Sequence, residues 1–117
     1  MKKIYQLSTC DTCKRILKEL QPIDGFVLQD IKTESITEDQ LTTMHELTGS
    51  YEALFSKRAR LYKERELNTK TLTELDYKNL ILEHYTFLKR PVILMDDIIF
   101  VGNSKKTITA AKEKLNS

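Results

Sequence analysis

The chain has 117 residues, of which 40% are apolar and 31% are charged, and its formal net charge at pH 7 is +2. This length and composition are typical of one soluble domain with its own core, so we expect a single domain over residues 1–117. The small net charge argues against direct binding of nucleic acid or of a membrane surface. A start with two lysines resembles a signal peptide, but only the short segment 4–7 follows before polar residues resume. We therefore expect no membrane span and a cytoplasmic location.

The first expected elements are a strand, a helix and a second strand. Ile4 to Leu7 has the character of a short buried strand. The segment from Cys13 to Leu20 places its apolar side chains on one stripe, which predicts a helix that ends before Pro22. Gly25 to Leu28 predicts a second strand, and parallel pairing with the first is expected because a helix separates the two.

The middle of the chain is expected to be mostly helical. Thr37 and Gln40 form a capping-box signal, and apolar residues follow at helical spacing until Gly49 ends the helix. Residues 51–85 are rich in Lys, Arg and Glu, with a turn expected around 68–71 before a further helix. The apolar residues expected on that helix are Leu75, Leu80 and Ile81.

The last part of the chain predicts a hairpin and a helix. Pro91–Met95 and Ile98–Val101 are expected to be strands joined by an Asp-Asp turn, and Ser104 is a suitable cap for a last helix. The resulting order is β-α-β, then helices, then β-β-α, which is the thioredoxin-like arrangement. We therefore expect an α/β fold with a mixed sheet and a helical insert, approximately residues 35–87, between the second and third strands.

Cys10 and Cys13 are the only cysteines of the chain, and they lie where the first strand passes into the first helix. The thiolate is the reactive form of cysteine, and a helix N-terminus or a nearby cation such as Lys14 lowers the thiol pKa from about 8.5. Cys10 is expected just ahead of the first helical turn, with Cys13 inside that turn and more covered. We therefore assign Cys10 as the nucleophile and Cys13 as the resolving thiol.

Two other interpretations of the cysteine pair remain open. A zinc site needs further ligands, and His45 and His84 do not supply a convincing ligand spacing, so no metal is expected. The two cysteines could also be unrelated core residues. The strand–turn–helix context favours redox chemistry, and no bound cofactor is expected.

Further candidate site residues surround the cysteine turn. Proline is tolerated at the start of a strand, and in thioredoxin-like folds a proline at the position of Pro91 is cis and faces the cysteine turn. Arg90 would then lie beside the Cys10 thiolate, where it could stabilise the thiolate or bind an anionic substrate. Thr9 and Thr12 flank the nucleophile, and Thr12 either caps the helix or donates a hydrogen bond to the thiolate.

A run of cations occupies residues 57–65. Glu64 and Glu66 interleave with it, which favours an ordinary solvated face. The alternatives are a surface for a partner or one wall of an anion site, and Arg58 is the best candidate for that wall.

Four separated motifs resemble the ArsC/Spx family, and the similarity runs nearly from end to end. The motifs are Cys10-Asp11-Thr12-Cys13-Lys14, Ser56-Lys57-Arg58, Lys89-Arg90-Pro91-Val92 and Val101-Gly102. The family comprises glutaredoxin-coupled arsenate reductases, Spx-type regulators of RNA polymerase and small YffB-like proteins regarded as thiol reductases. The resemblance implies a thioredoxin-like core with a helical insert and a nucleophilic cysteine at Cys10.

The resemblance to arsenate reductases covers Cys10 and Arg90 but is incomplete elsewhere. Two further arginines of their oxyanion site align with Glu52 and Gly102 of this chain. These reductases also generally lack a counterpart of Cys13. The lost cations weigh against arsenate as the substrate.

The other two branches each match part of the pattern. Spx-type regulators use a C-x-x-C pair as a redox switch and contact the RNA polymerase α subunit near a glycine that matches Gly49. They usually extend further beyond the last strand than this chain does. YffB-like proteins match its length and share the Cys-Asp-Thr start, the counterpart of Arg58 and the Arg90-Pro91 pair.

We therefore expect an enzyme, a cytoplasmic thiol–disulfide oxidoreductase of the arsenate reductase family that uses Cys10 and Cys13. Glutathione, glutaredoxin or thioredoxin would be its reductant. The expected substrate-binding residues are Arg90, Pro91, Arg58, Thr9, Thr12 and Lys14. The alternative is an Spx-like redox-switch regulator that binds the RNA polymerase α C-terminal domain through Gly49.

Overall fold

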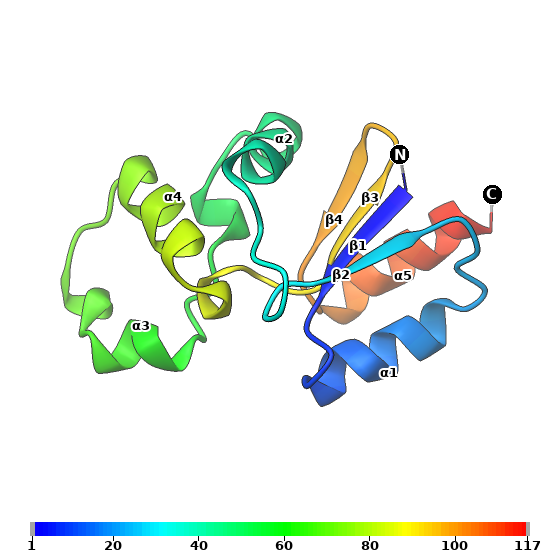
Figure 1. Cartoon of the computed structure of the whole chain (residues 1–117), viewed down its shortest axis with the longest axis horizontal. Coiled ribbons are helices and arrows are strands. Elements are labelled where there is room, and N and C mark those ends of the chain that lie inside the picture. Colours follow the sequence, from blue (N-terminus) through cyan, green and yellow to red (C-terminus); the bar gives the residue numbers. More distant parts are fainter. Residues whose placement is uncertain (1, 117) are drawn as a thin grey trace. The chain divides into compact units, whose positions relative to one another are not determined.

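The β-α-β start and the β-β-α end expected from the sequence are both present in the computed structural model, which describes residues 2–116 (Figure 1). The first three elements are β1 (Lys2–Gln6), α1 (Asp11–Leu20) and β2 (Val27–Asp30). The last three are β3 (Val92–Met95), β4 (Ile98–Val101) and α5 (Lys105–Leu115). Residues 2–34 and 90–116, which contain all six elements, form one compact unit that we call the sheet unit.

The residues between β2 and β3 form helices, as expected. In chain order these are α2 (Glu38–Thr48), the 3-10 helix η1 (Glu52–Leu54), α3 (Arg60–Glu64), η2 (Leu67–Thr69), α4 (Glu74–Glu83) and η3 (Tyr85–Phe87). They belong to a second compact unit, Ser35–Lys89, which we call the helical unit. The expectation of one domain over 1–117 with an insert at 35–87 stays a prediction.

The four strands form one mixed sheet in the order β2-β1-β3-β4. β1 pairs parallel to β2, while β3 is antiparallel to both β1 and β4. This arrangement confirms the predicted α/β, thioredoxin-like class. The register pairs Gln6 with Asp30 and Tyr5 with Val92. The C-terminal ends of β1 and β2 and the start of β3 therefore lie at the same end of the sheet.

The core of the sheet unit lies between the sheet and two helices. α1 and α5 both cover the same face of the sheet (Figure 1). The buried residues of this core are Ile4, Ile93 and Met95 from the sheet, Ile16 and Leu20 from α1, and Ile108 and Ala111 from α5. Their burial orients α1, and with it the cysteine turn, on the sheet.

The second strand differs from its predicted bounds. It was expected over Gly25–Leu28 but runs from Val27 to Asp30. Val27 is 60% exposed and Leu28 46%, because β2 is an edge strand and pairs with β1 alone. A short apolar segment does not distinguish such an edge strand from a central one.

The helical unit begins with the predicted capping box. The Gln40 N–H donates to Thr37 Oγ1, the Thr37 N–H donates to Gln40 Oε1, and both distances are 3.0 Å. Gly49 ends α2 as predicted, with a φ of 76° in the left-handed region that favours glycine. An unpredicted capping box of the same kind, made by Thr73 and Asp76, starts α4.

The core of the helical unit is aromatic. Phe55 is 1% exposed; its ring stacks on Phe87 at 5.3 Å and contacts Tyr77 at 4.8 Å, both between ring centroids. On α4, Tyr77 contacts Phe55, and Ile81, one turn later on the same side of the helix, is also buried, whereas Leu75 is 62% exposed. Leu75, Leu80 and Ile81 all lie on α4, as predicted.

None of the helices within residues 2–116 is both long and apolar enough to cross a membrane.

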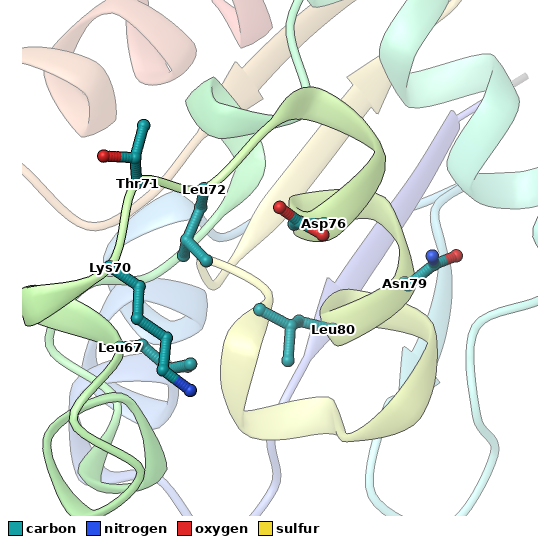
Figure 2. Close-up of a pocket in the computed structure, with 7 residues that line it drawn as sticks. All are labelled: Leu67, Lys70, Thr71, Leu72, Asp76, Asn79 and Leu80. Carbon is teal, nitrogen blue, oxygen red and sulfur yellow. The ribbon is translucent and has the colours of Figure 1, made fainter.

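A hollow of about 360 Å³ in the helical unit lies between the loop 70–72 and α4 (Figure 2). It is lined by Leu67, that loop, Asp76, Asn79 and Leu80. None of the predicted site residues lines it.

Candidate active site

A tight turn carries the first cysteine out of β1. The N–H of Cys10 donates to the carbonyl of Leu7 at 3.0 Å and closes a turn whose central residues are Ser8 and Thr9. α1 begins at Asp11, with Cys10 as the extended N-cap residue. Cys10 is therefore half-buried in front of the free N–H groups of a helix N-terminus, the position expected from the sequence.

The surroundings of Cys10 favour its thiolate. Partial burial by itself raises the pKa of this thiol, but several donors outweigh that effect and hold the pKa below its usual value. They are, in order of size, the N–H and the thiol of Cys13, the N–H of Thr12 and the guanidinium of Arg90. Donors that lower the pKa of a thiol stabilise its charged form, as nucleophile activation requires.

Cys13 has the opposite character. Its side chain is 0% exposed, and burial raises the pKa of this thiol to about 11, with a further increase from the nearby Cys10 charge. Cys13 therefore keeps its proton while Cys10 ionises, and both thiols are free in this structure. This order of acidity agrees with the assigned roles of nucleophile and resolving thiol, which themselves stay predictions.

Arg90 and Pro91 reach the cysteine turn through the sheet. β3 is antiparallel to β1, so the first residues of β3 lie beside the last residues of β1, at the same end of the sheet. The Arg90–Pro91 peptide bond is cis, as expected for this position, and the Pro91 carbonyl accepts the Gly102 N–H at 2.9 Å. Because the Arg90 guanidinium hydrogen-bonds to Cys10, the structure brings Cys10, Cys13 and Arg90 together.

The remaining predicted residues of the sheet unit contribute less. Thr9 is exposed on the turn, and Lys14 is exposed one turn into α1. The expectation that Thr12 caps the helix is wrong, because Cys10 occupies the N-cap and Thr12 lies within the first turn. Thr12 acts instead through its backbone N–H, which lowers the pKa of Cys10.

Two predicted residues belong to the helical unit. Arg58 is exposed in the turn before α3, and Gly49 is exposed at the end of α2. Glu52 accepts hydrogen bonds from Lys57 Nζ at 2.7 Å and Tyr77 Oη at 3.3 Å. The roles proposed for Arg58 and Gly49 stay predictions.

A contact between Ser8 and Asp30 at the cysteine turn was not indicated by the sequence. The hydroxyl of Ser8 donates a hydrogen bond to Asp30 Oδ2, at the end of β2. The two residues are far apart in the chain, and neither belongs to a recognisable motif. Only the parallel pairing of β1 with β2 could have suggested that the segments after the two strands lie together.

Comparison with known proteins agrees with this architecture. The ArsC family model matches residues 5–111. Global transcriptional regulator Spx 2 of Bacillus cereus is 28% identical over 110 residues, covering 90% of this chain and 82% of its own. An ArsC family related protein from Bacteroides fragilis has a TM-score of 0.80 at 24% identity and covers 97% of this chain and 96% of its own.

An arsenate reductase from Vibrio cholerae has a TM-score of 0.73 at 21% identity and covers 93% of this chain and 95% of its own. The two solved structures show a shared fold, and the Bacillus protein shows that regulators occur among the relatives. The family model spans nearly the whole chain. This protein therefore belongs to the ArsC family.

Proposed function

We propose that this protein is a thiol–disulfide oxidoreductase in which Cys10 is the nucleophile. The observation that carries the proposal is the opposite acidity of the two cysteines at the start of α1, with Cys10 acidic and Cys13 buried and protonated. Family membership agrees with such chemistry. Paired thiols that must stay reduced between turnovers fit the cytoplasm, where we place the protein.

In the proposed reaction, the Cys10 thiolate attacks one sulfur of a substrate disulfide. A mixed disulfide with Cys10 forms, and the other substrate sulfur leaves as a thiolate that takes up a proton. The sulfur of Cys13 then loses its proton and attacks Cys10, which releases the second substrate thiol. The substrate gains two electrons, and the protein is left with a Cys10–Cys13 disulfide.

The protein disulfide must be reduced before the next turnover. Two glutathione molecules, or the dithiol of glutaredoxin or thioredoxin, would supply the two electrons. Glutathione could also replace Cys13 in the resolving step. Arg90 would stabilise the thiolate and any anionic group of the substrate, while Pro91, Thr9, Thr12 and Lys14 border the approach to Cys10.

Arsenate is a weaker candidate than a disulfide. Glu52 is a carboxylate paired with Lys57, and Gly102 has no side chain, so neither position supplies the cation present in arsenate reductases. A dianion needs such charge-assisted donors. We therefore expect Arg90 to bind arsenate poorly.

The test is NADPH oxidation coupled through glutathione reductase and glutathione, measured above a blank without this protein. The substrate is bis(2-hydroxyethyl) disulfide without glutaredoxin, or arsenate with glutaredoxin added. We expect disulfide turnover that disappears in Cys10→Ser and little turnover with arsenate. With the disulfide alone and no glutathione, Cys13→Ser should still form the mixed disulfide and should accumulate it, which mass spectrometry detects. Undiminished disulfide turnover in Cys10→Ser would contradict the proposal.

A second candidate function is an Spx-like regulator whose Cys10–Cys13 disulfide changes its affinity for the RNA polymerase α C-terminal domain. The 28% identity to a Bacillus regulator supports this alternative. At Gly49 nothing lies within 4 Å of the position a Cβ would take, so a larger side chain there would project into open space. Such a side chain would block a partner without disturbing neighbours.

A pull-down on the α C-terminal domain with oxidised and reduced protein tests this candidate. Gly49→Arg should lose binding, and Gly49→Ala is the matched control because it carries the same backbone cost at a positive φ without the long side chain. Equal loss in both variants would indicate a folding effect. If neither the oxidised nor the reduced protein binds the domain, the regulator is excluded.

A further inference from the structure

The segments that leave β1 and β2 run side by side at the cysteine end of the sheet. Gln6 and Asp30 are partners in the parallel register, and the Ile31 N–H continues the ladder by donating to the Gln6 carbonyl at 2.9 Å. Asp30 thereby lies next to the turn that carries Cys10. Its carboxylate contacts that turn directly, because Oδ2 accepts the hydroxyl hydrogen of Ser8.

Asp30 is itself held by the loop that follows it. Its Oδ1 accepts the Lys32 N–H at 3.0 Å, and its carbonyl accepts the Glu34 N–H at 2.8 Å. A carboxylate that bonds a backbone N–H two residues ahead is restricted to few orientations. The second oxygen is therefore kept in place to accept from Ser8.

Few hydrogen bonds hold the turn, and two of them go to Asp30. Ser8 and Thr9 are exposed, the Cys10-to-Leu7 hydrogen bond closes the turn, and the Ser8 N–H as well as the Ser8 hydroxyl donates to the Asp30 carboxylate. A short exposed turn samples other conformations unless a side chain restrains it. The position of the Cys10 sulfur relative to the N–H groups of Thr12 and Cys13 depends on this turn.

We propose that Asp30 is a positioning residue that, through Ser8, holds the Leu7–Cys10 turn in the conformation in which Cys10 performs its thiol chemistry. The inference rests on the proposed role of Cys10 and adds a residue that fixes the conformation of the turn carrying Cys10. The Ser8 hydroxyl is the main cause of a lowered pKa at Asp30, which keeps the carboxylate ionised and accepting. Asp30 does not touch the substrate in this proposal.

The sign of the effect separates positioning from a direct charge effect. A carboxylate near Cys10 disfavours the thiolate by repulsion, so neutralising Asp30 should lower the Cys10 pKa if charge alone matters. If Asp30 positions the turn, its removal should raise the Cys10 pKa, because the donors to the thiolate lose alignment. Ser8→Ala keeps the charge of Asp30 and should raise the Cys10 pKa in the same way.

The experiment is the rate of alkylation of Cys10 by iodoacetamide as a function of pH, with the modified residue located by fragment mass spectrometry. We expect Asp30→Ala and Ser8→Ala to slow the reaction at pH 7 several-fold and to raise the apparent pKa. The double variant should match Asp30→Ala, since that change already removes the contacts of both the Ser8 hydroxyl and the Ser8 N–H with the carboxylate. Asp30→Asn keeps an oxygen that accepts from Ser8, so it should retain most of the wild-type profile.

Asp24→Asn is the charge control, because Asp24 is an exposed carboxylate before the opposite end of β2. Unchanged profiles in Asp30→Ala and Ser8→Ala, or a lowered pKa in either, would overturn the positioning role. If Asp30→Ala fails to fold, Ser8→Ala alone decides, because it removes only an exposed hydroxyl. An ordinary Cys10 pKa in the wild-type protein would instead contradict the proposed function itself.

Discussion

The sheet unit and the helical unit use their charged side chains in different ways. In the sheet unit Arg90 contacts the sulfur of Cys10, and Asp30 contacts the turn that carries it. In the helical unit several charged side chains pair with one another. The described ion pairs there are Lys57–Glu52 at 2.7 Å, Arg60–Glu64 at 3.2 Å, Lys78–Glu38 at 3.1 Å and Arg65–Glu83.

The difference shows that similar sequence features can have different physical roles. The basic run at 57–65 stands out in the sequence more than the single Arg90, yet three of its cations are paired with carboxylates at the surface. Surface pairs of this kind contribute little to stability. We therefore expect the stability of the helical unit to depend on its aromatic core and helix caps, and the thiol chemistry to depend on the sheet unit.

The largest effect is expected for Phe55→Ala in the helical unit. Phe55 is 1% exposed and contacts Phe87 and Tyr77, so its truncation should reduce the free energy of unfolding by about 3–5 kcal/mol. Chemical denaturation measures the loss. A loss below about 1 kcal/mol would show that neighbouring side chains fill the cavity, which would contradict the view that this core is close-packed.

The variant Phe55→Leu serves where Phe55→Ala does not fold, and it should cost less because more of the volume is retained. Its Cys10 alkylation profile should match that of the wild-type protein. A shifted Cys10 pKa in this variant would contradict the assignment of the thiol chemistry to residues of the sheet unit.

Local signals predicted the elements of both units well. The Thr37 capping box, the Gly49 helix end and the Ser104 cap each depend on residues within one turn of helix, and all three are present. The parallel pairing of β1 with β2 followed from the helix between them. These features were predictable because their physical cause lies within a short segment.

Several features that depend on distant residues were not predicted, although the place of Arg90 beside Cys10 was. The exposure of Val27 and Leu28 follows from the place of β2 at the sheet edge, and the exposed Leu75 from the packing of α4 on Phe55. The Ser8–Asp30 contact links two polar residues that no spacing rule connects. The Cys10 turn could be recognised as a site, whereas the residue that restrains it could not.

A smaller effect is expected from the cap of α4. Thr73 Oγ1 accepts the Asp76 N–H at 3.2 Å, and Asp76 Oδ2 accepts the Thr73 N–H at 2.8 Å. Thr73→Ala should lower the free energy of unfolding by about 1 kcal/mol. Thr71→Ala, in the preceding loop, is the matched control and should have almost no effect. Equal losses in the two variants would mean that the cap does not stabilise this unit.

The smallest effect is expected at the cap of α1, where the sheet unit carries a cysteine in place of a hydroxyl residue. Serine is a better N-cap than a neutral thiol, so Cys10→Ser should raise the free energy of unfolding by roughly 0.5 kcal/mol at pH 5.

The gain should shrink as the pH rises. The folded-state pKa of Cys10 is lowered, so the thiolate stabilises the wild-type protein above the unfolded pKa, and this contribution is lost as the pH falls through the folded pKa. Denaturation of both proteins from pH 5 to pH 9 measures the difference. A gain independent of pH would show that the folded protein does not stabilise the thiolate. The ionisation of Cys10 would then contribute as little to stability as the surface ion pairs of the helical unit.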